Sequence, residues 1–263
     1  MMKYYEECMF IIEQIKDAYS TYSTKKISIE DKAAFDLVTT LDRNIEQYIA
    51  QKIRQRYPND IIQGEEYTQS CFSTKRFWTI DPIDGTVNMA NGIPLFGVQC
   101  ALVAEQDVVT SAIYFPFSNS TLWAVKGMGS YCNSERIYVN SSINLDHGIV
   151  SFGDYSHKKS NPACNLQHSI ISIIYPQVAK IRMFGAACID FALVALGKTH
   201  ATVVCTKNLW DIAPGILLCK EAGAILTNCK GENYQLGDDG VVACATTELS
   251  QTIINAYTEC NYQ

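Results

Sequence analysis

The chain has 263 residues, of which 48% are hydrophobic and 18% charged, a balance that is typical of a globular protein and excludes a disordered one. Its 27 acidic and 21 basic residues give a net charge of -6. This charge argues against a surface for a nucleic-acid polymer, whose phosphates attract basic faces, but leaves small phosphorylated ligands open.

Apolar residues at helical spacing predict two amphipathic helices in the first part of the chain, at residues 2–22 and about 40–56. Short strands are expected at residues 61–62 and 77–80, and Asp81-Pro82 is expected to end the second because proline cannot donate to a sheet. Further short β runs predict an antiparallel meander at residues 97–104, 108–115, 121–125 and 136–139.

Strands and helices are mixed differently after about residue 147. The expected strands are residues 149–152, 180–183, 199–205, 224–226 and 241–245, and the expected helices are about 163–175, 187–196, 211–222 and 248–259. The mixture predicts an α+β fold with layered sheets. We expect an N-terminal α+β half (residues 1–145) with an antiparallel sheet and the acidic motifs, and a C-terminal α/β half (146–263). Together they would form one compact unit that shares the active site at its interface.

The eleven cysteines are scattered and include no Cys-x-x-Cys pair. This pattern is typical of buried, reduced thiols, which suit a reducing cytosol, rather than of a zinc site or a disulfide scaffold. The N-terminal segment MMKYYEECMF is too acidic for a signal peptide. No apolar run reaches the roughly 18–20 residues that span a membrane. We therefore expect a soluble cytoplasmic protein without a membrane partner.

The most informative stretch is Trp78-Thr79-Ile80-Asp81-Pro82-Ile83-Asp84-Gly85-Thr86. An apolar strand delivers two aspartates, and Gly85 then permits a tight turn and the close approach of a ligand. The backbone N–H groups of Gly85 and Thr86 could begin a helix and face an anion. Carboxylates for a hard cation beside N–H groups for phosphate suit Mg²⁺, which bridges carboxylates to substrate phosphate.

Other acids stand in comparable settings, and each has an ordinary structural explanation. Glu65 and Glu66 follow a strand, where paired acids are usually solvated. Asp211 precedes an apolar helical run and could be a helix N-cap, while Asp42 lies in the first turn of a helix and would complement its dipole. The two aspartates of the strand end could likewise be turn or cap residues. The combination of these acids, rather than any one of them, favours a metal-dependent site.

The ordered set of motifs resembles the inositol monophosphatase family, the Mg²⁺-dependent, lithium-sensitive phosphomonoesterases whose wider group includes fructose-1,6-bisphosphatase. The resemblance covers nearly the whole chain. It rests on Asp36-Leu37-Val38-Thr39-Thr40-Leu41-Asp42, Gly64-Glu65-Glu66, Asp81-Pro82-Ile83-Asp84-Gly85-Thr86 and Trp210-Asp211, with weaker matches at Lys126-Gly127-Met128-Gly129, Asn133 and Gly185-Ala186-Ala187-Cys188-Ile189-Asp190. It implies the layered αβαβα sandwich of that family, inhibition by lithium and a homodimer.

The resemblance also implies a role for each motif residue. One Mg²⁺ would be held by Glu65, Asp81 and the Ile83 carbonyl, a second by Asp81, Asp84 and Asp211, and a third, looser ion by Glu65 and water. Thr86 and Asp42 would form a hydrogen-bonded pair that orients and activates the attacking water, and Glu65 is counted with them as catalytic. The substrate would contact Gly85, Thr86, Asp84, Asp190 and Asp211.

The position that selects the substrate departs from the family. Family members have a glutamate seven residues before the Trp-Asp aspartate, where it contacts substrate hydroxyls, and here Val204 takes its place and cannot accept those bonds. Lys207 could face a second phosphate or a phosphosugar, or could be a solvated loop lysine. The substrate therefore stays open among an inositol phosphate, a sugar phosphate such as fructose 1,6-bisphosphate, histidinol phosphate and a 3′-phosphoadenosine nucleotide. A non-catalytic metal-binding regulatory protein is the alternative from a different class.

Overall fold

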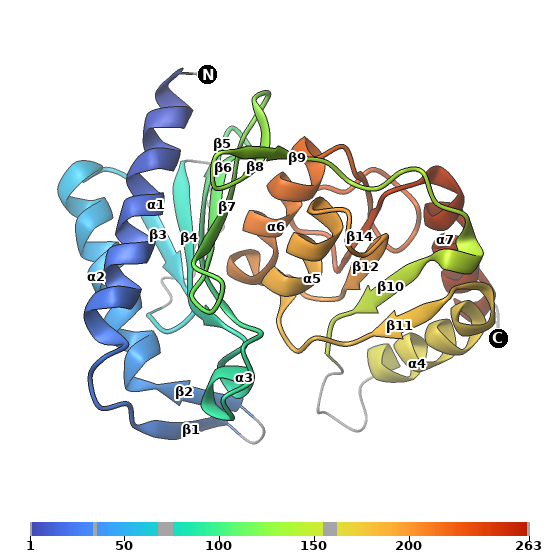
Figure 1. Ribbon diagram of the computed structural model, residues 1–263, viewed down its shortest axis with the longest axis horizontal. Coiled ribbons are helices and arrows are strands. Elements are labelled where there is room, and N and C mark those ends of the chain that lie inside the picture. The colour runs from blue at the N-terminus through green and yellow to red at the C-terminus, as the bar shows by residue number, and fades with distance from the viewer. Residues whose placement is uncertain (1, 34–35, 68–75, 155–161, 262–263) are drawn as a thin grey trace.

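A seven-stranded sheet dominates the first half of the computed structural model, which describes residues 2–33, 36–67, 76–154 and 162–261 (Figure 1). The strand order is β3-β4-β5-β6-β7-β8-β9, and neighbours are antiparallel except for β3 and β4. The strands are β3 (Ile61–Gly64), β4 (Phe77–Asp84), β5 (Gly97–Ala104), β6 (Asp107–Phe115), β7 (Ser120–Val125), β8 (Gly129–Cys132) and β9 (Glu135–Ile137). The predicted meander is confirmed, although β8 was not foreseen.

Two long helices cover the outer face of this sheet, and both occur where the apolar spacing predicts them. They are α1 (Met2–Tyr22) and α2 (Thr40–Arg56). Their buried faces, which include Ile15 and Ile49, pack with Trp78 and Ile80 of the sheet in one hydrophobic cluster. A two-stranded ribbon, β1 (Ile29–Ala33) and β2 (Asp36–Thr39), leads into α2 and has no clear signal in its charged sequence.

A five-stranded sheet organises the second half of the chain, in the order β11-β10-β12-β14-β13. Strand β10 is parallel to both of its neighbours, and β14 is antiparallel to both of its own. The strands are β10 (Ile149–Phe152), β11 (Lys180–Arg182), β12 (Ala201–Val204), β13 (Ile225–Thr227) and β14 (Val241–Cys244). The short helix α3 (Thr86–Ala90) belongs to the first half of the chain. The helices of the second half are α4 (Pro162–Ile174), α5 (Ala187–Ala195), α6 (Leu209–Glu221) and α7 (Thr247–Asn261), with 3₁₀ turns at Leu145–His147 and Tyr175–Gln177.

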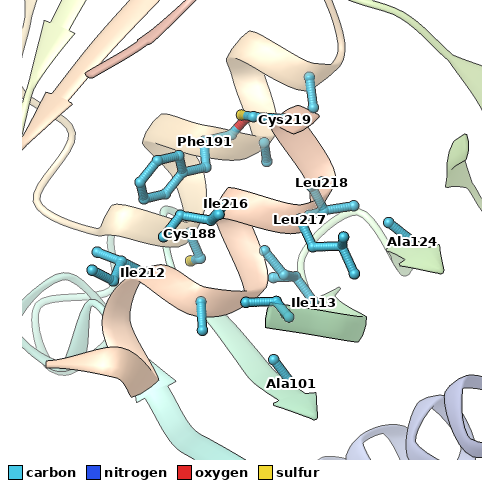
Figure 2. Close-up of a cluster of buried hydrophobic side chains, with 14 of the residues drawn as sticks. Ala101, Ile113, Ala124, Cys188, Phe191, Ile212, Ile216, Leu217, Leu218 and Cys219 are labelled. Carbon is cyan, nitrogen blue, oxygen red and sulfur yellow. The ribbon is translucent and has the colours of Figure 1, made fainter. Parts of the chain in front are cut away.

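Helices α5 and α6 lie between the two sheets, whereas α4 and α7 cover the far side of the second one (Figure 1). The layers therefore follow the order helix, sheet, helix, sheet, helix, which confirms the predicted αβαβα sandwich. Figure 2 shows the middle layer, in which Phe191 of α5 and Ile216 of α6 lie in the cluster that also holds Ala101 and Ile113 of the first sheet. The division of the chain near residue 145 stays a prediction.

Strand β4 does not end at Asp81-Pro82, so that expectation was wrong. Asp81 pairs with Gln99 and Asp84 with Gly97, which leaves one extra residue on β4 between the two pairs. This β-bulge takes up the proline, because a bulged position need not donate a ladder hydrogen bond. The strand thereby carries both aspartates to the end of the sheet.

The described part of the chain contains no helix that is long and apolar enough to cross a membrane. The expectation of buried, reduced thiols is confirmed for Cys8, Cys100, Cys188, Cys219 and Cys244, which are buried and free. It was wrong for Cys205, a free cysteine that is exposed as a residue. The side chains of Cys71 and Cys164 lie outside the described residues.

The contact between α5 and α6 generates a stability prediction. A Cβ atom at Gly215 of α6 would lie 2.3 Å from the ring of Phe191, which is completely buried in α5. We expect Gly215→Ala to lower the free energy of unfolding by about 1–3 kcal/mol, because a packed core cannot admit the methyl group without moving the ring. Gly153→Ala is the control, since its nearest contact would be an ordinary 3.6 Å. Urea unfolding measures both, and equal stability of the two variants would contradict the expectation.

Candidate functional site

Gln99 on β5 brings the main acidic residues together. Its side-chain amide Nε2 lies 3.2 Å from Asp81 Oδ2, 3.3 Å from Asp84 Oδ2 and 3.3 Å from the backbone carbonyl of Asp211. These three groups come from the end of β4 and from the first turn of α6. Gln99 is itself completely buried. Gln99 was not among the predicted site residues, although a lone glutamine inside the apolar strand Gly97–Ala104 is a visible signal.

Asp81 is buried among like charges. Only 1% of the residue is exposed, and burial raises its pKa well above the usual range, with the charges of Glu65, Asp84 and Asp211 adding to the effect. Its Oδ1 atom is buried and has no hydrogen-bond partner among the described residues. The other oxygen receives the Gln99 amide. An acceptor with an open lone pair in so negative a place is a ready ligand for a cation.

Asp84 faces the first turn of α5. Its carboxylate accepts hydrogen bonds from the backbone N–H of Ala187, at 3.2 Å, and from that of Cys188. Burial raises the pKa of Asp84 to about 6, and the N–H donors of α5 oppose that rise. In this arrangement both oxygens of Asp84 have protein partners, and no cluster of three or more acidic, histidine or cysteine side chains within the described residues forms a closed metal cage.

No ion pair within the part of the chain that the structure describes includes Asp42, Asp81 or Asp84. Buried carboxylates without a counter-charge must either take up protons or bind a cation. The donors are all oxygen atoms, which Mg²⁺ prefers over the softer ligands that zinc takes. The donor set therefore fits Mg²⁺.

The expected pairing of Thr86 and Asp42 is present. Thr86 Oγ1 lies 3.0 Å from Asp42 Oδ1 and 2.8 Å from the Ile83 carbonyl, so its one hydroxyl proton has two possible acceptors. Asp42 is held in turn by Thr39, in a capping box at the start of α2. Burial raises the pKa of Asp42, and its hydrogen bonds to Thr39 and Thr86 counteract this.

Gly85 sets the direction of the backbone at this point. Its φ of +94° is in the left-handed region, and a Cβ atom there would lie 2.8 Å from the carbonyl oxygen of Leu95. A side chain is therefore excluded both by conformation and by space. Helix α3 begins at the next residue, Thr86, as the sequence predicts. Asp211 lies in the first turn of α6 but is not its N-cap, because the helix begins at Leu209 and Asn208 occupies that position.

Glu65 stands just beyond β3 on a turn that α2 supports. Buried Glu46 of α2 accepts hydrogen bonds from the backbone N–H of Glu66, at 2.8 Å, and of Tyr67, at 3.0 Å. A Cβ atom at Gly64 would lie only 1.9 Å from the Glu46 carboxylate, so glycine is required for this approach. The Gly64-Glu65-Glu66 motif is visible in the sequence, whereas the supporting role of Glu46 is revealed only by tertiary contact.

The residues considered for substrate contact differ widely in exposure. Asp190 is completely buried in α5, and burial raises its pKa well above the usual range. Val204, the last residue of β12, is 5% exposed and belongs to the central hydrophobic cluster. The exposed side chain of Lys207 forms an ion pair with Asp239 at the surface.

Comparison with known proteins decides the family. A model of the inositol monophosphatase family matches residues 5–262. The chain belongs to the inositol monophosphatase family. The fructose-1,6-bisphosphatase/inositol-1-monophosphatase of Aquifex aeolicus is 33% identical over 214 residues, which are 81% of this chain and 80% of that protein. The Nus factor SuhB of Pseudomonas aeruginosa is 32% identical over 222 residues, 82% of this chain and 81% of that protein. Phosphatase chemistry is thus supported for the family as a whole.

Solved structures of the family share the fold. The IMPase of Thermotoga maritima has a TM-score of 0.84 and 27% identity, covering 100% of this chain and 99% of that one. An IMPase/NADP phosphatase complexed with Mg²⁺ and phosphate has a TM-score of 0.83 at 22% identity and covers 97% of each chain. The second likeness concerns the fold alone.

The raised pKa of Asp84 generates a prediction on stability. Its pKa is about 6 in the folded protein against about 4 in an unfolded chain, so the folded state binds more protons between these values. The metal-free protein should therefore lose about 2 kcal/mol of unfolding free energy as the pH rises from about 4 to above 6. Asp84→Asn should lose less over the same range.

Mg²⁺ should counteract this loss of unfolding free energy at high pH. It would bind the deprotonated carboxylates, which lie close together only in the folded state, and would thereby stabilise that state. We expect Mg²⁺ to raise the thermal midpoint more at pH 7.5 than at pH 5. Calorimetry of the protein in EDTA and in Mg²⁺ measures the thermal midpoint. The control is a Ca²⁺-free buffer in which Na⁺ replaces Mg²⁺ at equal ionic strength. A midpoint that responds equally to Mg²⁺ at both pH values would contradict it.

Proposed function

We propose that the protein is a Mg²⁺-dependent phosphatase that hydrolyses a small phosphorylated metabolite by attack of water on a phosphate monoester. The observation that carries the proposal is the pair of carboxylates that Gln99 contacts, Asp81 and Asp84, for which the described residues provide no ion pair and which lie beside the Thr86–Asp42 pair. A purely structural role for these acids would leave the charge burial around Asp81 without a benefit.

The metal-binding residues would be Glu65, Asp81, the Ile83 carbonyl, Asp84 and Asp211, with two or three Mg²⁺ ions in the complete site. When bound, Mg²⁺ offsets the charge of the phosphate and lowers the pKa of a coordinated water molecule. Each carboxylate oxygen of Asp84 accepts one backbone N–H, from Ala187 or from Cys188, and Oδ1 keeps a second lone pair for the ion. These hydrogen bonds to the first turn of α5 would hold the carboxylate in place while it binds the ion.

Thr86 and Asp42 would orient the attacking water. The hydroxyl proton of Thr86 is donated to Asp42 Oδ1 at 3.0 Å, which leaves a lone pair on Oγ1 to accept a proton from water. As the water loses that proton, Thr86 passes its own to Asp42, whose raised pKa favours its uptake. The backbone N–H groups of Gly85 and Thr86 would bind the phosphate oxygens. Glu65 would be the third catalytic residue beside Thr86 and Asp42, because it would hold one of the Mg²⁺ ions.

The substrate would be chosen at the end of β12. Asp84, Asp190 and Asp211 are the remaining predicted substrate contacts. Asp190 is completely buried, so it would influence the substrate from beneath the protein surface. Val204 offers no hydrogen bond to a hydroxyl-rich ring. Fructose 1,6-bisphosphate, histidinol phosphate and 3′-phosphoadenosine nucleotides therefore remain alternatives to an inositol phosphate.

A regulatory role is the second candidate, because the Pseudomonas aeruginosa relative is named Nus factor SuhB. The catalytic pair and the acidic motifs are all retained in this chain, so we favour the enzyme. With the family we also propose a homodimer, a cytoplasmic location and inhibition by lithium at the second metal site.

Substitution of metal ligands tests the proposal. Asp84→Asn and Asp211→Asn should each lower Mg²⁺-dependent phosphate release from a generic monoester at least about 100-fold, because a neutral amide binds Mg²⁺ poorly. Asp146→Asn is the matched control, since that exposed aspartate lies in the 3₁₀ turn far from the motifs. Both site variants should retain the wild-type circular dichroism spectrum. Wild-type turnover in either would overturn the assignment.

A substrate panel tests the specificity. Loss of one charged hydrogen bond to a hydroxyl is worth about 1.5–3 kcal/mol, or about 10–100-fold in kcat/KM. Inositol 1-phosphate should therefore be at least about tenfold poorer than the best of fructose 1,6-bisphosphate, histidinol phosphate and 3′-phosphoadenosine 5′-phosphate. Inositol 1-phosphate as the best substrate would show that Val204 does not decide the preference, and no release from any of them would favour the regulatory role.

A further inference from the structure

Two cysteines line a cavity at the end of β12. The cavity has a volume of about 280 Å³ and is lined by Cys205, Cys229, Tyr257, Lys230 and Asp238, among others. Cys205 directly follows β12, Cys229 follows β13, and Tyr257 lies in α7. Three elements that are distant in the sequence thus place two free thiols and a phenol at one point.

The two cysteines share a cavity and a neighbouring side chain. Cys205 Sγ lies 3.5 Å from the hydroxyl of Tyr257, and Tyr257 and Cys229 line the same cavity. Gly240 lies close to both cysteines. A Cβ atom there would lie 3.1 Å from Cys229 Sγ and 3.4 Å from Cys205 Cα, so both residues border the same small space.

Both cysteines stand on anchored backbone. Asn228 Oδ1 accepts hydrogen bonds from the N–H of Lys230 and of Glu232, at 3.0 and 3.1 Å, which fixes the turn that carries Cys229. Cys205 is tied to β12, whose residues pair in register with β14. The meeting of the thiols is therefore a property of the packed fold and not of a chance loop position.

The environment divides the two thiols into unlike partners. A hydrogen bond from Cys229 lowers the pKa of Cys205 to about 7, against the effect of burial, and Tyr257 contributes a second donor. The pKa of Cys229 is raised by the same hydrogen bond. Cys205 is the more exposed residue of the two, and Cys229 is half-buried. The thiol with the lowered pKa therefore belongs to the more exposed residue.

We propose that Cys205 and Cys229 form a redox pair in which Cys205 reacts with a hydroperoxide and Cys229 converts the product to a disulfide. The Cys205 thiolate attacks one oxygen of the peroxide, the O–O bond breaks, and the departing hydroxide or alkoxide takes a proton from solvent, which leaves a sulfenic acid and water or an alcohol. Cys229 sulfur then attacks the Cys205 sulfur, the S–O bond breaks, and the sulfenic hydroxyl leaves as water with the Cys229 thiol proton. The two thiols are oxidised and the hydroperoxide is reduced.

The pair lies next to the link that holds Asp211. Thr206, the residue after Cys205, contacts Asp211 Oδ2 through its hydroxyl at 3.3 Å. A disulfide would fasten this strand end to the β13 turn and so act on the chain just before α6. The chemistry of the pair does not depend on the proposed phosphatase function, and its test needs no substrate.

Oxidation of the reduced, full-length protein with hydrogen peroxide tests the proposal. After N-ethylmaleimide blocks the remaining thiols, peptide mass mapping should find Cys205 linked to Cys229, and dithiothreitol should reverse the link. In Cys229→Ser the sulfenic acid at Cys205 should persist and be captured by dimedone. In Cys205→Ser neither the link nor dimedone at Cys229 should form. Cys260→Ser, which removes a half-buried cysteine of α7, is the matched control and should keep the link.

Alkylation rates provide a second measurement. At pH 7 about half of Cys205 would be thiolate against about 1% for a thiol of ordinary pKa, and a tenfold lower intrinsic nucleophilicity leaves it about fivefold faster with iodoacetamide. The comparison is with half-buried Cys132 and Cys260, whose pKa values are raised by burial. The proposal fails if peroxide yields no Cys205–Cys229 link in the wild type, or if Cys229→Ser does not accumulate dimedone at Cys205.

Discussion

The burial of several carboxylates around Asp81 is the constraint on which the rest of this molecule depends. Burial and the charges of Glu65, Asp84 and Asp211 all oppose ionisation of Asp81, and among the described residues no ion pair relieves it. Such an arrangement costs free energy in the metal-free protein. It is sustained by the Gln99 amide, by the N–H groups of α5 and by the hydrophobic layers on either side. A divalent cation would relieve the repulsion among the buried carboxylates, and this relief would favour both its binding and the folded state.

The layered fold explains how acids from distant parts of the chain reach one place. The bulge at Pro82 extends β4 so that it carries two aspartates, and the close contact of α5 with α6 at Gly215 sets where the first turn of α6 lies. Helix α2 contributes from the outer layer, since its capping box aims Asp42 at Thr86. The site thus joins the outer helices, the first sheet and the middle layer, and a shift of any one would separate its parts.

The end of β12 combines three features in consecutive residues. Val204 belongs to the central core, Cys205 lines a cavity together with Cys229, and the Thr206 hydroxyl contacts Asp211. The proposed substrate preference, the proposed thiol chemistry and the position of a proposed metal ligand would therefore all depend on one short segment. A chemical change at Cys205 would affect both Val204 and Thr206, because the three residues are consecutive in the chain.

The sequence by itself determined the amphipathic helices, most strands, the family and the acidic motifs, because these depend on local spacing and on residues that stand close together in the chain. It did not show that β4 passes Pro82, that Asp190 is completely buried, or that Gln99 and Glu46 support the site. Nor did it pair Cys205 with Cys229. Only the tertiary structure decided these points, since register, burial and side-chain contacts arise when segments far apart in the chain pack against each other.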